Sequence, residues 1–276
     1  MEKELVKQIG NILESIRRKK PLIHHITNYV TVNDCANITL AIGASPIMAD
    51  DIGEAEAITS ISSALVLNIG TLNERTIKSM LAAGKRANEI KIPVVFDPVG
   101  AGASELRSRT TERILHEVRI SVLRGNMSEI RFIAGLNSTT KGVDASDTDQ
   151  QSGIEVGRSI AETVAKKFGC VAAITGATDF LSDGKRTIFL NNGTKLLSDV
   201  TGTGCMCTSL VGSFCGASED YLFAAAGGVL CMGVAGEIAA EKTRETGNGS
   251  FHMALIDAVS EMTVATIEGK AKIHET

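Results

Sequence analysis

Short apolar segments that alternate with helical ones constrain the fold of this chain more than any other feature. The apolar segments lie at Leu22–Ile26, Leu65–Ile69, Val94–Phe96, Ile120–Leu123 and Val171–Thr175. None shows the strict apolar and polar alternation of a strand with one wet face, so each indicates a strand that is covered on both faces. Helical periodicity occupies the intervening segments near residues 28–42, 73–90, 105–118 and 151–168. This alternation predicts an α/β protein with a mostly parallel sheet between two layers of helices.

Two further segments complete the predicted architecture. Phe180-Leu181 and Thr187–Leu190 flank Ser182-Asp183-Gly184-Lys185, a pattern typical of a hairpin with Asp-Gly at the turn. Beyond residue 203 the periodicity is helical, with expected helices at 205–216, 219–241 and 251–268. No repeat, low-complexity tract or long linker divides the chain. We therefore expect a single domain over residues 1–276.

Charge, hydropathy and cysteine usage exclude several classes of function. The formal net charge of -4 gives no electrostatic footprint for nucleic acid. We expect the basic run Arg17–Lys20 to be a solvated helix end. No apolar stretch approaches the roughly 20 uncharged residues of a membrane span, and the charged, amphipathic N-terminus does not resemble a signal peptide. The six cysteines form no C-x-x-C pair. We expect a cytoplasmic protein without disulfides, with no membrane or nucleic-acid partner.

The segment Asp199–Cys205 carries the strongest functional pattern, because its sequence DVTGTGC leads directly into an apolar helix. Gly202 and Gly204 allow positive φ angles and expose successive backbone N–H groups. Together with the helix N-terminus, these groups can form a pocket for an anion. Charge on a migrating phosphoryl group would be stabilised there. A plain glycine-rich turn is the alternative interpretation.

Polar side chains follow three of the predicted strands, where ligands of open α/β sheets bind. Asp97 and Glu129 carry carboxylates suited to Mg²⁺, held directly or through water. Arg124 can form two parallel bonds to phosphate oxygens, and the Thr175 hydroxyl could meet a phosphate. Structural roles are open alternatives: Asp97 could cap the next turn, and Asn126 with Glu129 could cap a helix.

Two segments near the N-terminus, HITNYV and GASPIM, contain candidates for contact with an organic substrate. Asn28 can hydrogen-bond a heteroatom, while Val30 and Met48 offer polarisable or apolar surface. On composition alone, Met48 fits a core position better than a ligand contact. His24 and His25 have no accompanying nucleophile motif, so we expect them to be structural.

Taken together, these segments resemble the hydroxyethylthiazole kinase family of the ribokinase-like superfamily. The matching stretches are HHITNYVTVNDCANITLAIGASPIMAD, FDPVGAGAS, LRGNMSEI, ITGATDF and DVTGTGCM. The resemblance implies a ribokinase-like three-layer sandwich that transfers the γ-phosphate of ATP, with Mg²⁺, to the primary hydroxyl of 4-methyl-5-(2-hydroxyethyl)thiazole in thiamin salvage. It also implies a homotrimer with active sites at the subunit interfaces.

The same resemblance implies roles for individual residues. The implied thiazole contacts are Met48 and Gly202, with Asn28 and Val30 in the same pocket. The implied ATP contacts are Arg124 and Thr175, together with the Gly204 amide. Asp97 and Glu129 match the acids near the metal, and Cys205 occupies the catalytic position. A helix N-terminus can lower a thiol pKa, so Cys205 is expected to be a thiolate or a hydrogen-bond acceptor that orients the substrate hydroxyl.

Three other functions remain open at this point. A kinase for another small alcohol, such as hydroxymethylpyrimidine, would share the fold and differ in a substrate panel. A nucleotide-dependent dehydratase acting on a hydrated nicotinamide cofactor would couple nucleotide hydrolysis to NADH recovery. A nucleotide-binding sensor would bind ATP without alcohol-dependent ADP release, and would leave Cys205 and the acid pair without a use.

Overall fold

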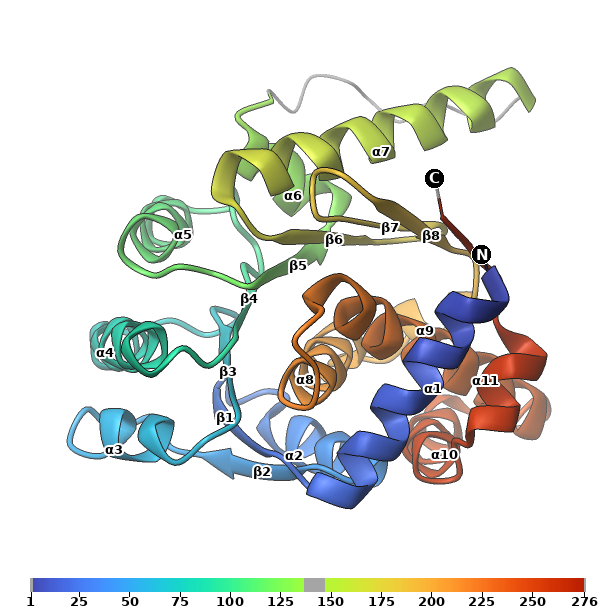
Figure 1. The fold of residues 1–276 in the computed structure, drawn as a ribbon, viewed down its shortest axis with the longest axis horizontal. Helices are drawn as coiled ribbons and strands as arrows, with labels where there is room; N and C mark the ends of the chain where they lie inside the picture. The colour runs from blue at the N-terminus through green and yellow to red at the C-terminus, as the bar shows by residue number, and fades with distance from the viewer. Residues whose placement is uncertain (1, 137–146, 276) are drawn as a thin grey trace.

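A computed structural model, which describes residues 2–136 and 147–275, contains one nine-stranded sheet in the order β2-β1-β3-β4-β5-β6-β7-β8-β9. The first six strands in sequence are parallel, and the last three pair in antiparallel fashion (Figure 1). The strands are β1 (Leu22–Ile26), β2 (Ser45–Met48), β3 (Ala64–Asn68), β4 (Val94–Asp97), β5 (Val122–Asn126), β6 (Val171–Thr175), β7 (Asp179–Ser182), β8 (Thr187–Leu190) and β9 (Ile273–Glu275).

Helices cover both faces of this sheet, as predicted (Figure 1). One layer consists of α1 (Glu2–Lys19), α2 (Val32–Ile42), α8 (Thr203–Cys215), α9 (Tyr221–Lys242), α10 (Asn248–Ser260) and α11 (Val264–Lys270). The opposite layer consists of α3 (Ala55–Ser60), α4 (Glu74–Ile90), α5 (Glu105–Glu117), α6 (Met127–Ala134) and α7 (Asp147–Phe168). The short 3₁₀-helix η1 (Lys195–Ser198) leads from β8 towards α8.

Each central strand contributes to two separate hydrophobic cores. Val66 of β3 packs in the core beside α8 and α9, whereas its neighbours Leu65 and Leu67 pack in the core beside α4. All three side chains are at most 1% exposed. Because successive side chains of a strand point to opposite faces, burial on both faces requires a continuous apolar run. The sequence pattern and the three-layer architecture thus have one cause.

Some boundaries differ from the sequence prediction. The strand expected at Ile120–Leu123 is β5, which begins at Val122 and continues through Arg124 to Asn126. The expected helix 251–268 is two helices, since Thr263 caps a new start at α11 by accepting a hydrogen bond from the Thr266 amide. The Asp-Gly hairpin is confirmed as β7 and β8, with Gly184 at a φ of +86°.

Two edge strands have no clear signal in the sequence. Pro46 lies inside β2, where the missing N–H is tolerated because β2 pairs only with β1. The other edge strand, β9, consists of three residues and pairs with β8, with Ile273 opposite Leu190. Tertiary pairing, not local propensity, forms both strands.

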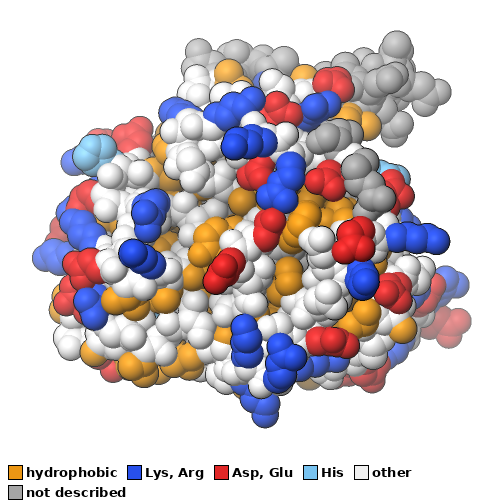
Figure 2. Space-filling model, in the orientation of Figure 1, with side chains coloured by type: hydrophobic (Ala, Val, Ile, Leu, Met, Phe, Trp, Pro, Cys, Tyr) orange, Lys and Arg blue, Asp and Glu red, His pale blue; other side chains and the backbone are white. Residues whose placement is uncertain are grey.

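Helix α9 corrects the expectation that no segment could span a membrane. Within the described residues, it is the one helix with the length and hydropathy of a membrane span. However, 83% of the apolar 18-residue stretch of this helix is buried inside the fold, so α9 is a core helix. Charged side chains of both signs are interspersed over the face shown in Figure 2. The basic run that was expected to be solvated lies at the C-terminal end of α1.

Close packing of α8 on α9 generates a stability prediction at Gly228. A Cβ at this position would lie 2.6 Å from the backbone N and Cα of Val211, which cannot move as a flexible side chain could. We expect Gly228→Ala to lower the free energy of unfolding by about 1–3 kcal/mol, as measured by urea denaturation. The control is Gly269→Ala in α11, where nothing lies within 4 Å and alanine should stabilise by up to about 1 kcal/mol. Equal effects of the two substitutions would contradict the packing argument.

Candidate active site

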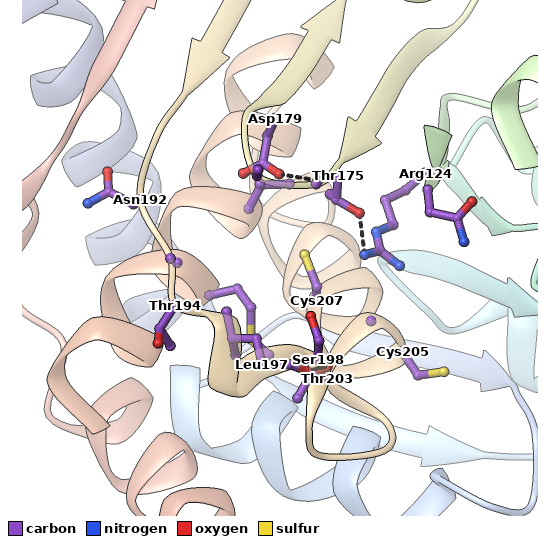
Figure 3. A pocket seen from close by; sticks show the side chains of 18 of the residues that line it. Arg124, Thr175, Asp179, Asn192, Thr194, Leu197, Ser198, Thr203, Cys205 and Cys207 are labelled. Atoms are coloured by element: carbon purple, nitrogen blue, oxygen red, sulfur yellow. Dashed lines mark hydrogen bonds between the residues drawn. The ribbon is translucent and has the colours of Figure 1, made fainter. Parts of the chain in front are cut away.

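A cavity of about 710 Å³ opens at the carboxyl ends of the central strands, against the start of α8. Asp97 comes from the end of β4, Arg124 from β5 and Thr175 from the end of β6, while Cys205 comes from the first turn of α8. In the close view of Figure 3, Asn192 and Thr194 lie at the left and Arg124 at the right, with Thr175 and Cys207 between them, and Cys205 projects from the first turn of α8 on the same side as Arg124. The glycine-rich segment therefore faces the cavity and is not an isolated turn.

The first turn of α8 has the geometry of an anion site. Gly202 caps the helix with a φ of +91°, a conformation that side-chain-bearing residues rarely adopt. A Cβ at Gly202 would also meet the Thr31 methyl group at 2.8 Å. The Thr203 hydroxyl donates to the Leu197 carbonyl at 2.6 Å and so fixes the approach of the chain. The first amides of a helix have no intrahelical acceptor, and here they border the cavity together with Gly204.

The Cys205 sulfur lies between two buried amides. Both Asn28 Nδ2 and Asn68 Nδ2 donate to Sγ at 3.3 Å. Burial, followed by the nearby Asp97 carboxylate, raises the pKa of the thiol above its usual value, although the Thr31 side chain and the two amides favour the anion. The raised pKa favours the neutral thiol over the thiolate, which was one of the two states that the sequence left open. The sulfur accepts hydrogen bonds from the two amides, and its expected role towards a substrate hydroxyl stays a prediction.

Asp97 is a buried carboxylate with an incomplete set of partners. Its Oδ2 accepts hydrogen bonds from Asn68 Nδ2 at 3.0 Å and from the Thr208 hydroxyl at 2.7 Å, and Arg124 lies 3.7 Å away. Within the described structure Oδ1 is buried without a hydrogen-bond partner. Burial raises the pKa of Asp97 to about 6. A buried carboxylate with one unpaired oxygen fits a site that binds a cation.

Glu129 both caps a helix and borders the cavity, as the sequence allowed. With Asn126 it forms a capping box at the start of α6: its Oε2 accepts from the Asn126 amide at 2.8 Å, and the Glu129 amide donates to Asn126 Oδ1 at 3.0 Å. Its Oε1 accepts from the Gly100 amide at 2.8 Å. The carboxylate thus connects the loop after β4 to the loop after β5. Only the remaining lone pairs of its two oxygens are available to a hydrated ion.

Arg124 and Thr175 form a direct pair across two neighbouring strands. Arg124 Nη2 donates to the Thr175 hydroxyl at 2.5 Å (Figure 3). Thr175 pairs with Asn126 in the ladder between β5 and β6, and Arg124 lies two residues before Asn126 in β5. A guanidinium held in this position can point its remaining N–H groups into the cavity, towards phosphate oxygens.

Three of the four expected substrate contacts do not line this cavity. Val30 is 56% exposed just before α2, and Met48 is half-buried at the end of the edge strand β2. Asn28 does not border the cavity either, but it reaches the site through Cys205. His24 and His25 are buried in β1; His24 bonds Thr59 and the Ala49 carbonyl, consistent with a structural role.

The sequence analysis missed several residues around the cavity. Asn191–Thr194 and Leu197 form one wall, and Met232 of α9 and Asp179 of β7 also border it. Asp179 accepts from the Gly176 amide at 2.9 Å, and burial raises its pKa to about 7. The polar stretch Asn191-Asn192-Gly193-Thr194 directly after a strand was a usable signal. Asn68 was also missed: it does not line the cavity and reaches the site through Asp97 and Cys205.

The sheet and its helix layers define a class of protein: an α/β protein of the ribokinase-like fold. A ribokinase-like superfamily protein from Enterococcus faecalis superposes with a TM-score of 0.65, covering 92% of this chain and 95% of the other, at 9% identity. At such low identity the likeness concerns the fold alone. It confirms the expected three-layer α/β class.

The particular family follows from closer similarities. The model of the hydroxyethylthiazole kinase family matches residues 13–265. A hydroxyethylthiazole kinase from Clostridium beijerinckii is 64% identical over 100% of both chains. A solved hydroxyethylthiazole kinase from Pyrococcus horikoshii superposes with a TM-score of 0.88 at 38% identity, over 98% of this chain and 99% of that one. The chain belongs to the hydroxyethylthiazole kinase family.

The capping role of Glu129 can be tested by a substitution that keeps its shape. In Glu129→Gln, one oxygen becomes an NH₂ group that must face one of the two backbone N–H donors. We expect the free energy of unfolding in urea to fall by about 1–3 kcal/mol. Glu89→Gln, which removes an exposed ion pair with Arg86, should cost at most about 0.5 kcal/mol. A similar small cost for both substitutions would show that the two loops do not depend on Glu129.

Proposed function

We propose that this protein phosphorylates the primary hydroxyl of 4-methyl-5-(2-hydroxyethyl)thiazole with ATP, in thiamin biosynthesis or salvage. The single observation that carries the proposal is the placement of the α8 N-terminus and Cys205 opposite Arg124 and Asp97 in one cavity. Unpaired helix amides and a guanidinium suit an anion with several oxygens. Membership of the hydroxyethylthiazole kinase family supports the choice of acceptor.

In the proposed mechanism the protein mainly positions reactants and neutralises charge. Arg124 and Thr175, with the Gly204 amide, hold the nucleotide phosphates, and the amides at the start of α8 receive the charge of the transferred group. Asp97 and Glu129 would hold Mg²⁺, which neutralises phosphate charge when bound; the buried, unpaired Asp97 Oδ1 fits this use. Mg²⁺ commonly takes one or two carboxylates plus phosphate oxygens, so no larger ligand cluster is needed.

Cys205 would orient the attacking oxygen. The substrate hydroxyl oxygen bonds to the γ-phosphorus as the bond from that phosphorus to the β–γ bridging oxygen breaks. ADP leaves with the bridging oxygen, and the hydroxyl proton passes to an oxygen of the transferred phosphoryl group. Because this transition state is largely dissociative in most analyses, little proton removal is needed before the new bond forms. A neutral thiol with a raised pKa is therefore compatible with the reaction. Gly202, Asn28, Val30 and Met48 would contact the thiazole.

The substrate half of the site is open in one chain, and we propose that a homotrimer completes it. Val30 is 56% exposed and its neighbour Tyr29 is 79% exposed, next to the Asn28 that contacts Cys205. Large apolar side chains so close to a reactive group are suited to burial by another subunit. We propose that residues 1–276 act as one cytoplasmic kinase domain with the active sites at the subunit interfaces.

Alcohol-dependent ADP release tests the function directly. With ATP and Mg²⁺, adding the thiazole alcohol should raise ADP release at least about tenfold over the alcohol-free rate, measured by a coupled assay. Hydroxymethylpyrimidine in place of the thiazole should give far less. ADP release that is independent of the alcohol, or faster with the pyrimidine, would contradict the proposal.

Substitutions at Cys205 test its role. Cys205→Ala should lower kcat by about tenfold to a thousandfold while the Kd for ATP changes less than about threefold, because the thiol faces the acceptor. Cys205→Asp should keep activity, since a carboxylate can accept the same hydrogen bond. Cys170→Ala, at a buried thiol outside the cavity, is the control and should leave kcat unchanged. Full turnover by Cys205→Ala at saturating substrate would remove this role.

A further inference from the structure

Asn68 connects two groups of the site and has no role in the reaction as described so far. It is the last residue of β3 and is 1% exposed. Its amide nitrogen lies 3.0 Å from Asp97 Oδ2 and 3.3 Å from Cys205 Sγ. An amide nitrogen carries two hydrogens, so a single NH₂ group can serve both acceptors at once.

Backbone donors fix the orientation of this amide. Asn68 Oδ1 accepts from the Gly70 N–H at 2.8 Å, and a backbone N–H can only donate. The same holds for Asn28, whose Oδ1 accepts from the Thr31 N–H at 3.1 Å. Neither side chain can turn its amide over without placing an NH₂ group against an N–H donor. Both nitrogens therefore face the sulfur.

All four amide hydrogens of the pair have acceptors. Asn28 Nδ2 donates to Asn68 Oδ1 at 3.0 Å and to Cys205, while Asn68 Nδ2 donates to Asp97 and to Cys205. The sulfur thus accepts two hydrogen bonds from groups that are themselves held. In a buried place such a closed network has few alternative arrangements, so the loss of one member should displace the others.

The loop that holds Asn68 is anchored by a second residue. Arg107 of α5 donates to the carbonyl oxygens of Ile69 and Gly70, each at 2.7 Å, and also to that of Val99. It thereby joins the loop after β3 to the loop that follows Asp97. The position of Asn68 relative to Asp97 does not depend on the strand pairing alone.

We propose that Asn68 is a positioning residue that sets the relation of the Cys205 sulfur to the Asp97 carboxylate and keeps the sulfur as a hydrogen-bond acceptor. The inference rests on the proposed roles of Cys205 and Asp97. It assigns to Asn68 no contact with substrate. Its effect on turnover should act through the two groups that it holds.

The test uses Asn68→Leu, which keeps the approximate shape and removes both donors, and Asn68→Ser, whose short hydroxyl cannot reach both acceptors. We expect kcat to fall about tenfold or more in each variant, while the KM for ATP changes less than about threefold. Asn88→Leu is the matched control. Its amide bonds the backbone of Arg119, away from the cavity, so it should lower stability without changing kcat.

A second measurement does not depend on kinase activity. The rate of alkylation by iodoacetamide is measured as a function of pH, and the modified cysteine is identified by peptide mass spectrometry. Cys205 is the expected target because the other five cysteines are buried. Loss of one donor to the sulfur should move the midpoint of this profile up by about half to one pH unit. The midpoint of Asn88→Leu should match the unsubstituted protein.

The outcomes separate the two proposals. A lower kcat and a raised midpoint in both Asn68 variants support the positioning role. Variants that lose only thermal stability, with kcat and midpoint unchanged, would overturn it and leave Asn68 a structural residue. If the unsubstituted protein fails to phosphorylate the thiazole alcohol, the proposed function falls, while the shifted midpoint would still establish the contact with Cys205.

Discussion

The first turn of α8 against the carboxyl edge of the parallel sheet is the contact on which the rest of the site depends. Its unpaired amides can act only where no water or side chain competes, so the helix must approach the strands closely. Small residues permit this approach: a Cβ at Gly212 would meet a Val66 methyl group at 2.5 Å, and Gly228 lets α9 pack against the α8 backbone. The cavity is therefore a product of core packing, and the reactive groups need only short side chains to reach it.

Much of this arrangement could be predicted from the sequence, because local physics determines it. Strands buried on both faces require unbroken apolar runs, and the runs were visible at β1, β3, β4 and β6. Ligands of open sheets bind beyond the strand ends, so the polar residues at those ends were natural candidates. The structure brings Asp97, Arg124, Glu129, Thr175, Gly202, Gly204 and Cys205 to one cavity. Their roles in the reaction remain proposals.

The remainder depended on contacts between distant parts of the chain. No local pattern shows that β2 and β9 pair at the edges of the sheet, or that Thr263 divides the last helical stretch. The sequence left the ionisation state of Cys205 open for a similar reason. A helix N-terminus is visible in sequence, whereas the burial and the Asp97 charge that raise the pKa of the thiol come from the tertiary structure. Asn68 was overlooked because a single amide in an apolar strand gives no indication of its partners, one of which lies 137 positions away.

Helix α1 has a consequence for the order in which this chain can fold during synthesis. Its apolar side packs on α9 and α11: a Cβ at Gly10 would meet Val264 at 2.8 Å, and Ile9 lies against Gly227. Helix α1 is thus translated well before α9 and α11, the helices that it packs against. Until those segments emerge, Leu5, Ile9, Leu13 and Ile16 have no native surface to cover them. A nascent chain of this kind carries an exposed apolar stripe from the synthesis of α1 until α9 and α11 have emerged, and transiently exposed apolar surface of this sort is prone to aggregation.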